Sequence, residues 1–345
     1  MNRAKNFGEP GRVLAVSIGG LGDTILFSPV LRALRKSYPE TYIELLVANR
    51  LAEEVYSCAD LISSVTFLNL NRSSIILKSA SLLSFILKAR LNGGFSAGFF
   101  AAGLDSKIGS FLKYAGIVKH LAFAPAPQSC STDLNCNLEL ARSINETALE
   151  YDVFVPIKNK FMLEAMNLLN EHSISLDKDV IVAIYPSVEL IHRPRWELAK
   201  LIHVIQLLKN DGFNGKIVVV GSQHEGDEWE ALDKENIADA NLAGKLTILG
   251  SAALLSKCSL TIGNDGGLMH VAGAVGSPLV TMMANAPLSY RPPGENVKII
   301  QSKLGCCDGK YPNRPKGCLV AKCTDAIKVQ EVYEACIQRL SGLQN

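Results

Sequence analysis

Residues 259–278 read Ser259-Leu-Thr-Ile-Gly-Asn-Asp-Gly-Gly-Leu-Met-His-Val-Ala-Gly-Ala-Val-Gly-Ser-Pro278. The apolar run 259–262 predicts a buried strand, 263–267 a tight glycine-rich turn, and 268–275 a helix that Gly276 and Pro278 terminate. The free N–H groups of such a turn, at the positive end of a helix, form a site for an anion such as phosphate. This stretch therefore predicts a ligand-binding strand–turn–helix unit.

Asp265 and His270 flank the start of that helix, five residues apart. A structural alternative stays open at this point. Asp265 would then be the N-cap of an ordinary helix, and His270 a helix residue with a partner inside the protein.

A second glycine-rich turn follows the first strand of the chain. Residues 12–18 predict this strand, Gly19-Gly20-Leu-Gly22-Asp23 the turn, and 24–38 a helix. The turn is a poor dinucleotide fingerprint, because the third glycine is missing and Asp23 would repel a pyrophosphate. Either Asp23 takes part in chemistry or it caps the helix.

The composition is that of a well-packed α/β protein. The 345 residues are 48% hydrophobic and 20% charged, with a net charge of +2, so nothing predicts a nucleic-acid partner. The polar start predicts no secretory signal, and no apolar run is long enough to span a bilayer. We expect a cytoplasmic protein.

Strand and helix patterns alternate twice along the chain. They predict an α/β fold of two doubly wound, Rossmann-like domains that face a central cleft. We place the domains at residues 1–165 and 175–325. Residues 326–345 predict a C-terminal helix, with packing back on the first domain as one option. Residues 124–137 are interpreted as a loop, and a helix is expected from 139 to 149.

The two turns together resemble glycosyltransferase family nine, the heptosyltransferases. Ser17 to Asp23, followed by Pro29 and the helix Val30-Leu-Arg-Ala-Leu-Arg, is similar to the first signature of that family. Asn264-Asp-Gly-Gly-Leu-Met-His270, followed by Ala-Gly-Ala-Val-Gly-Ser-Pro, is similar to the second. The resemblance extends over residues 11–335.

This resemblance implies a GT-B fold and an inverting, metal-independent transfer of a sugar from a nucleotide sugar. The donor would be ADP-heptose, and the acceptor a lipid-anchored saccharide of the lipopolysaccharide core. It implies further that Asp23 is the general base, in a turn formed by Gly19, Gly20 and Gly22. No cofactor is expected beyond the nucleotide-sugar substrate.

The second turn would then bind the donor. The N–H groups of Gly266, Gly267 and Leu268 would hold the diphosphate, with His270 against the ribose or phosphate and Asp265 orienting the loop. Ser187, Gln223 and Glu225 follow other strands and are weaker candidates for donor contacts.

One loop departs from the family pattern. Ile191-His192-Arg193-Pro194 stands where the family usually has Lys-x-Trp-Pro, whose lysine contacts the diphosphate. Arg193, or else His192, would supply the cation, because a guanidinium matches phosphate with forked donors. The alternative is that Arg193 and Arg195 belong to a solvated loop.

Two further features are open. Cys306, Cys307, Cys318 and Cys323 lie close together in sequence and could bind zinc, although they lack paired Cys-x-x-Cys spacing; the resemblance implies a structural or redox-neutral role for them. Residues 75–90 predict an amphipathic helix with lysine and arginine. It would either pack on the core or rest on the inner membrane, where a lipid-linked acceptor lies.

Two other functions compete with sugar transfer. A dehydrogenase or sugar-nucleotide epimerase would need a complete Gly-x-Gly-x-x-Gly turn and an acidic residue after the second strand, where Asn49 and Arg50 stand instead. A non-catalytic relative that only binds a nucleotide sugar is the other alternative. The presence of Asp23 argues against it.

Overall fold

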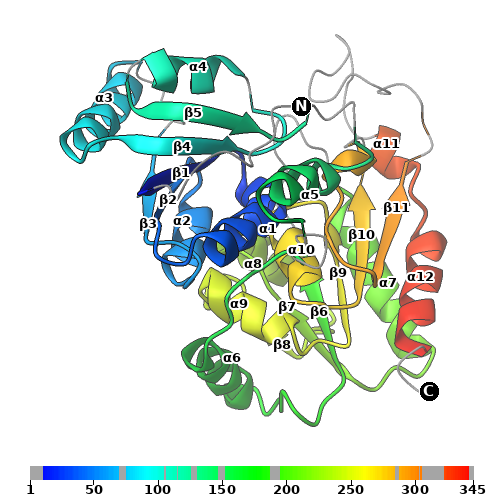
Figure 1. The fold of residues 1–345 in the computed structure, drawn as a ribbon. Coiled ribbons are helices and arrows are strands. Elements are labelled where there is room, and N and C mark those ends of the chain that lie inside the picture. Colours follow the sequence, from blue (N-terminus) through cyan, green and yellow to red (C-terminus); the bar gives the residue numbers. More distant parts are fainter. Residues whose placement is uncertain are drawn as a thin grey trace. The chain divides into compact units, whose positions relative to one another are not determined.

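The computed structural model describes residues 11–69, 75–104, 106–114, 116–125, 130–146, 152–186, 195–283, 287–302, 304 and 322–341. Its contacts divide the chain into two units, Met1–Pro156 and Ile157–Asn345 (Figure 1). Each unit contains one parallel sheet with helices connecting its strands, so the predicted α/β class is confirmed.

The first unit has a five-stranded parallel sheet in the order β3-β2-β1-β4-β5. Its described elements are β1 (Arg12–Ser17), α1 (Leu21–Ser37), β2 (Tyr42–Val47), α2 (Arg50–Ser57), β3 (Ser64–Phe67), α3 (Ile75–Leu91), β4 (Phe95–Phe100), α4 (Ser106–Tyr114), β5 (Val118–Phe123) and α5 (Asp133–Ile144). Helices α3 and α4 pack on one face of the sheet in a single apolar cluster. Helix α5 packs along α1.

The second unit has a six-stranded parallel sheet in the order β11-β10-β9-β6-β7-β8. Its described elements are α6 (Asn159–Glu171), β6 (Ile181–Tyr185), α7 (Leu198–Asn210), β7 (Lys216–Val219), α8 (Gln223–Leu232), β8 (Ala240–Asn241), α9 (Ile248–Leu255), β9 (Leu260–Asn264), α10 (Gly267–Ala274), β10 (Leu279–Met283), a short 3-10 turn (Leu288–Tyr290), β11 (Val297–Gln301), α11 (Lys322–Asp325) and α12 (Val329–Ser341).

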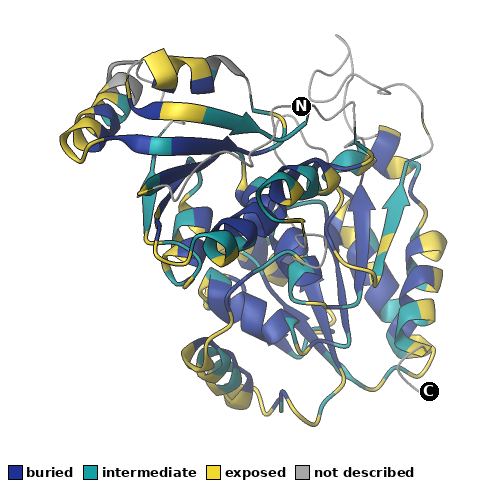
Figure 2. Cartoon of the chain, viewed as in Figure 1, coloured by how far each residue is buried: buried dark blue, intermediate teal, exposed yellow. Residues whose placement is uncertain are grey.

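Burial explains why the central strands are continuous apolar runs. Every residue of β9 and β10 is buried, whereas the edge strand β11 is only partly covered (Figure 2). A parallel strand with helices on both faces has no solvent side, so it needs no alternation of polar residues. Trp196 and Trp229 are the largest fully buried side chains and fill the core of the second unit.

Both sheets reverse their strand order at one point. In the first unit this point lies between β1 and β4, and in the second between β6 and β9. In doubly wound sheets, ligands bind at the carboxyl ends of the strands beside such a reversal. The two glycine-rich turns follow β1 and β9, so each turn lies at the reversal of its own sheet.

Two expectations about helices need correction. Helix α5 begins at Asp133 inside the predicted 124–137 loop, because Thr132 caps it by accepting from Asn135 N–H, and it ends at Ile144. Helix α1 begins at Leu21, so Gly22 and Asp23 are helical rather than part of the turn. The C-terminal helix α12 buries its apolar side against α7, β9 and β10, so its packing lies in the second unit.

Among the described helices, none has the length and apolar character needed to cross a bilayer.

Candidate functional site

The turn after β1 places a carboxylate at the reversal of the first sheet. Asp23 is the third residue of α1, and its Oδ2 accepts a hydrogen bond from Gly20 N–H at 2.6 Å. Below it, the Ser17 hydroxyl donates to Thr24 Oγ1 at 3.1 Å and ties the strand end to the helix. Asp23 therefore does cap the helix start, its side chain is half-buried, and its role as a base stays a prediction.

Gly19 makes room for that carboxylate. A Cβ built on Gly19 would lie 2.3 Å from Asp23 Oδ2, whereas one on Gly20 would meet it at an ordinary 3.5 Å. Any side chain at position 19 would displace the Asp23 side chain. Gly19 and Gly20 thus shape the turn, and Gly22 lies buried within α1.

After the turn that follows β9, helix α10 begins without a side-chain cap. Gly266 is the N-cap of α10 and has no side chain to accept from the first N–H groups. Asp265 belongs to the strand end instead, where its N–H donates to Met282 at 3.0 Å. The alternative in which Asp265 is the N-cap is therefore wrong. Gly267 and Leu268 are the first two residues of α10, in the geometry that receives an anion.

Tyr185, at the end of β6, was missed by the sequence reasoning. A Cβ on Gly266 would lie 2.9 Å from its ring and hydroxyl, and a Cβ on Gly263 would lie 2.8 Å from its Cβ. The Tyr185 ring therefore packs directly on the backbone of the β9 turn. The glycines at 263 and 266 are the sequence signal for this close approach.

Tyr185 also connects that turn to Glu225. Glu225 is 2% exposed and accepts from the backbone and side chain of Ser222 and from Tyr185. Burial raises the pKa of the Glu225 carboxyl above its ordinary value, and these hydrogen bonds offset part of the rise. Glu225 thus caps α8 and supports the turn through Tyr185.

Asn264 joins the chain on both sides of residues 187–194 to the end of β9. Its Oδ1 accepts from Trp196 N–H at 2.6 Å, and its Nδ2 donates to the Pro186 carbonyl at 2.7 Å and to the Trp196 carbonyl at 3.1 Å. The amide is buried, so these bonds are made without competition from water.

Some of the remaining candidate residues are described by the structure, and others are not. His270 is buried in the first turns of α10, whereas Gln223 is exposed and donates to Asp227 at 2.7 Å. Arg195 forms an ion pair with Glu228, so it is not simply solvated. Ser187, His192 and Arg193 lie outside the described residues, and their contacts stay predictions.

Nothing in the described residues forms a cluster of three or more histidine, cysteine or acidic side chains suited to a metal ion. Cys323 is buried and described, while Cys306, Cys307 and Cys318 lie outside the described residues. The triplet Asp177-Lys178-Asp179 has the spacing of an Asp-x-Asp metal motif. It precedes β6, however, at the edge of the sheet opposite the predicted site, and Asp179 accepts from Ser175 N–H.

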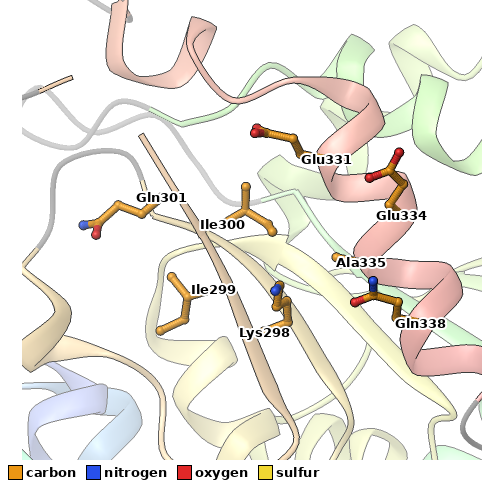
Figure 3. Close-up of a pocket in the computed structure, with 8 residues that line it drawn as sticks. All are labelled: Lys298, Ile299, Ile300, Gln301, Glu331, Glu334, Ala335 and Gln338. Atoms are coloured by element: carbon orange, nitrogen blue, oxygen red, sulfur yellow. The ribbon is translucent and has the colours of Figure 1, made fainter. Parts of the chain in front are cut away.

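A shallow hollow of about 280 Å³ lies between β11 and α12 (Figure 3). Lys298 and Gln301 line it from the strand, and Glu331, Glu334 and Gln338 from the helix. None of the predicted site residues lines this hollow, so it lends no support to the donor site.

Comparison with known families identifies the family of this chain. Residues 131–320, more than half of the chain, match the model of glycosyltransferase family 9 (heptosyltransferase). The chain belongs to glycosyltransferase family 9. The predicted GT-B class of two Rossmann-like domains is thereby confirmed.

Single members of the family are only distantly similar to this chain in sequence. Lipooligosaccharide heptosyltransferase 2 of Haemophilus influenzae is 26% identical over 150 residues, which cover 41% of this chain and 43% of that protein. The match thus spans less than half of the length of this curated relative.

Two solved structures share the fold over nearly the whole chain. The family 9 glycosyltransferase of Veillonella parvula has a TM-score of 0.76 at 17% identity and covers 96% of this chain and 97% of its own. The ADP-heptose lps heptosyltransferase II of Escherichia coli has a TM-score of 0.71 at 18% identity, with 97% and 100% covered.

Proposed function

We propose that this chain is an inverting glycosyltransferase that moves a sugar from a nucleoside-diphosphate donor to a saccharide of the bacterial surface. Heptose is the first candidate for the sugar, ADP for the nucleotide, and the lipopolysaccharide core for the acceptor. The observation that carries the proposal is the pair of turns at the strand-order reversals, one with a carboxylate and one with open N–H groups.

The second unit would bind the donor. A departing nucleoside diphosphate develops negative charge, and preorganised N–H donors at a helix N-terminus stabilise that charge. The Gly266–Leu268 backbone supplies such donors, and Arg193 or His192 would add a cation. The choice of ADP-heptose rests on the family and on the E. coli enzyme, whose name includes that donor.

The first unit would supply the base. Asp23 would accept the proton of the acceptor hydroxyl while the hydroxyl oxygen attacks the anomeric carbon and the bond from that carbon to the diphosphate breaks. The proton ends on the Asp23 carboxylate, and the diphosphate leaves with the bonding electrons. A well-placed general base contributes 10²–10⁴-fold to a rate. No metal ion takes part in the proposed transfer.

The acceptor is expected to be lipid-linked, and helix α3 offers a surface for it. Leu83, Leu87 and Leu91 follow one another at turn spacing and are 56%, 53% and 87% exposed, next to the exposed Lys88. Phe85, Ile86 and Ala89 on the opposite side pack on the sheet. Helix α3 thus serves as a core helix and also exposes a leucine stripe with basic neighbours, which suits the surface of an anionic membrane.

Vesicle binding tests this surface. Wild-type protein should sediment with vesicles of anionic phospholipid and lose most of this binding in Leu87→Asp. Leu163→Asp on α6 is a matched control, because Leu163 is similarly exposed but outside this stripe. Equal sedimentation of all three proteins would exclude α3 as the membrane surface.

A turnover assay tests the function itself. Purified protein is given ADP-heptose and a heptose-free lipopolysaccharide core, and ADP release and the mass of the acceptor are followed. Release of ADP together with one added heptose supports the proposal. Transfer from another nucleotide sugar would replace heptose as the donor. Tight nucleotide binding without transfer from any donor would instead assign the chain as a non-catalytic relative.

A further inference from the structure

Helices α1 and α5 of the first unit lie side by side and run in the same direction. At their C-terminal ends, Asn145 Nδ2 donates to Ser37 Oγ at 3.1 Å. One third of the way from their starts, the buried Asn137 Nδ2 donates to the Leu26 carbonyl at 3.1 Å. Two contacts in the same order along both helices require a parallel arrangement.

This arrangement brings the first turns of the two helices together. Asp23 precedes Leu26 by three residues on α1, and Asp133 precedes Asn137 by four residues on α5. Both carboxylates therefore lie in first turns at the same end of one helix pair. Asn137 Oδ1 also accepts from Ala102 N–H at 2.9 Å, which fixes α5 to the end of β4 beside the strand-order reversal.

The Asp133 carboxyl is unusually placed for a charged group. Its residue is only 4% exposed, and its Oδ1 is buried without a hydrogen-bond partner among the residues that the structure describes. A buried carboxylate oxygen without a donor costs free energy, and a purely structural role does not explain it. Burial, and after it the charge of Asp23, raises the pKa of Asp133 to about 6.

Within the described part of the chain, the other titratable groups near Asp133 do not neutralise it. Cys130, Cys136 and Glu139 come from its own helix or from just before it, and burial raises the pKa of Cys136 to about 12, so that thiol stays protonated. Helix α1 contributes Asp23, and residues 101–104 after β4 have no titratable side chain. Asp133 and Asp23 thus interact as a pair of like charges.

We propose that Asp133 is a positioning residue of the sugar transfer: its buried carboxylate, which the parallel packing of α5 on α1 places at the same helix end as Asp23, makes Asp23 the stronger base while it is ionised and so speeds the transfer. The proposal rests on the proposed function of Asp23. Two adjacent carboxylates resist being charged together, so an ionised Asp133 favours proton uptake by Asp23. Once Asp133 is protonated, this assistance is lost.

The test is the pH dependence of kcat/KM for Asp133→Asn, which removes the charge and keeps the shape. Wild-type kcat/KM should fall about threefold as the pH drops through about 6, where Asp133 takes up its proton, and should fall further at lower pH as Asp23 itself is protonated. In Asp133→Asn we expect this step near pH 6 to disappear and the plateau above it to be about threefold lower, because Asp23 is then the weaker base at every pH. Ser37→Ala loosens the far end of the same helix pair and should leave the step in place.

A step near pH 6 that persists in Asp133→Asn would overturn the proposal, even if the rate falls. Carbon-13 NMR titration of the aspartate carboxyls gives a readout without turnover. The midpoint of Asp133 should drop in Asp23→Asn, and an unchanged midpoint would also overturn the proposal. If Asp23→Asn remained fully active, the proposed function of Asp23 would fail instead, so the two failures are distinguishable.

Discussion

The turn after β1 and the turn after β9 occupy equivalent places in their sheets, yet they start their helices differently. The third residue of α1 is Asp23, whose carboxylate accepts from Gly20 N–H. The third residue of α10 is the buried Met269, which has no oxygen to offer. The same strand–turn–helix arrangement therefore presents a carboxylate at the helix start in the first unit and uncapped backbone N–H donors in the second.

Each unit also holds its turn with a buried asparagine. Asn264 makes three hydrogen bonds around the end of β9, and Asn137 makes two between α1, α5 and the loop after β4. The charge of each site therefore depends on a few side chains, while a buried amide fixes the chain nearby; Asn264 belongs to the quoted motif, whereas no sequence pattern singled out Asn137.

The largest effect is expected from removing the charge of Asp23, which distinguishes the turn after β1 from the turn after β9. Asp23→Asn should lower kcat by 10²–10⁴-fold, because an amide cannot take the acceptor proton. The amide oxygen can still accept from Gly20 N–H, so the melting temperature should stay close to that of the wild type. Steady-state kinetics with a nucleotide-sugar donor measures the effect. A loss of less than tenfold would remove Asp23 from the role of base.

The two buried asparagines give the next largest effect. Asn264→Ala should lower the free energy of unfolding by about 3 kcal/mol, and Asn137→Ala by about 2 kcal/mol, because each leaves buried N–H and carbonyl groups unpaired. Urea denaturation measures both values. Equal and small losses, below about 1 kcal/mol, would show that water replaces these bonds.

The charge of Asp133 at the start of α5 should make the free energy of unfolding depend on pH. The pKa of Asp133 is raised to about 6 from an ordinary 3.8. This carboxyl stabilises the fold while protonated, below its unfolded pKa, and that contribution is lost as the pH rises through about 6. Asp133→Asn should therefore be more stable than the wild type at pH 8 by about 1–2 kcal/mol, less than the full shift implies, because the helix dipole favours the charge.

Thermal unfolding at pH 8 and pH 4 checks the sign of this effect. The advantage of Asp133→Asn should vanish at the lower pH. An advantage that grows as the pH falls would contradict a raised pKa for Asp133.

Much of this architecture was predictable because the central strands are uninterrupted apolar runs followed by glycine. Both turns were found this way, whereas the family and its GT-B class came from the resemblance of these two turns to the family signatures. The start of α5 was missed because residues 124–137 are rich in Pro, Ser and Asn. The pair Thr132-Asp133, an N-cap followed by an acidic first turn, was the overlooked signal.

Tertiary contacts explain the other misses. No local pattern shows that Tyr185 packs on Gly266 or that α12 belongs to the second sheet. The pairing of Asp133 with Asp23 joins residues 110 positions apart and depends on the parallel packing of two helices. Such features become visible only when the fold is known.

The smallest expected effect is on donor affinity. Gly266→Ala places a Cβ 2.9 Å from the Tyr185 ring and hydroxyl, so the ring or the turn must move. We expect ADP to bind about tenfold more weakly, which corresponds to about 1.4 kcal/mol. Gly11→Ala is the matched control, because its Cβ would meet nothing within 4 Å. Unchanged affinity in Gly266→Ala would argue against the Gly266 turn as the diphosphate site.

The most direct test of the division between the two turns is calorimetric titration of ADP into wild-type protein, Asp23→Asn and Gly266→Ala. We expect the wild type and Asp23→Asn to bind ADP with equal affinity and Gly266→Ala to bind it more weakly. Binding that is lost in Asp23→Asn and kept in Gly266→Ala would place the nucleotide at the turn after β1 and contradict the proposed division of roles.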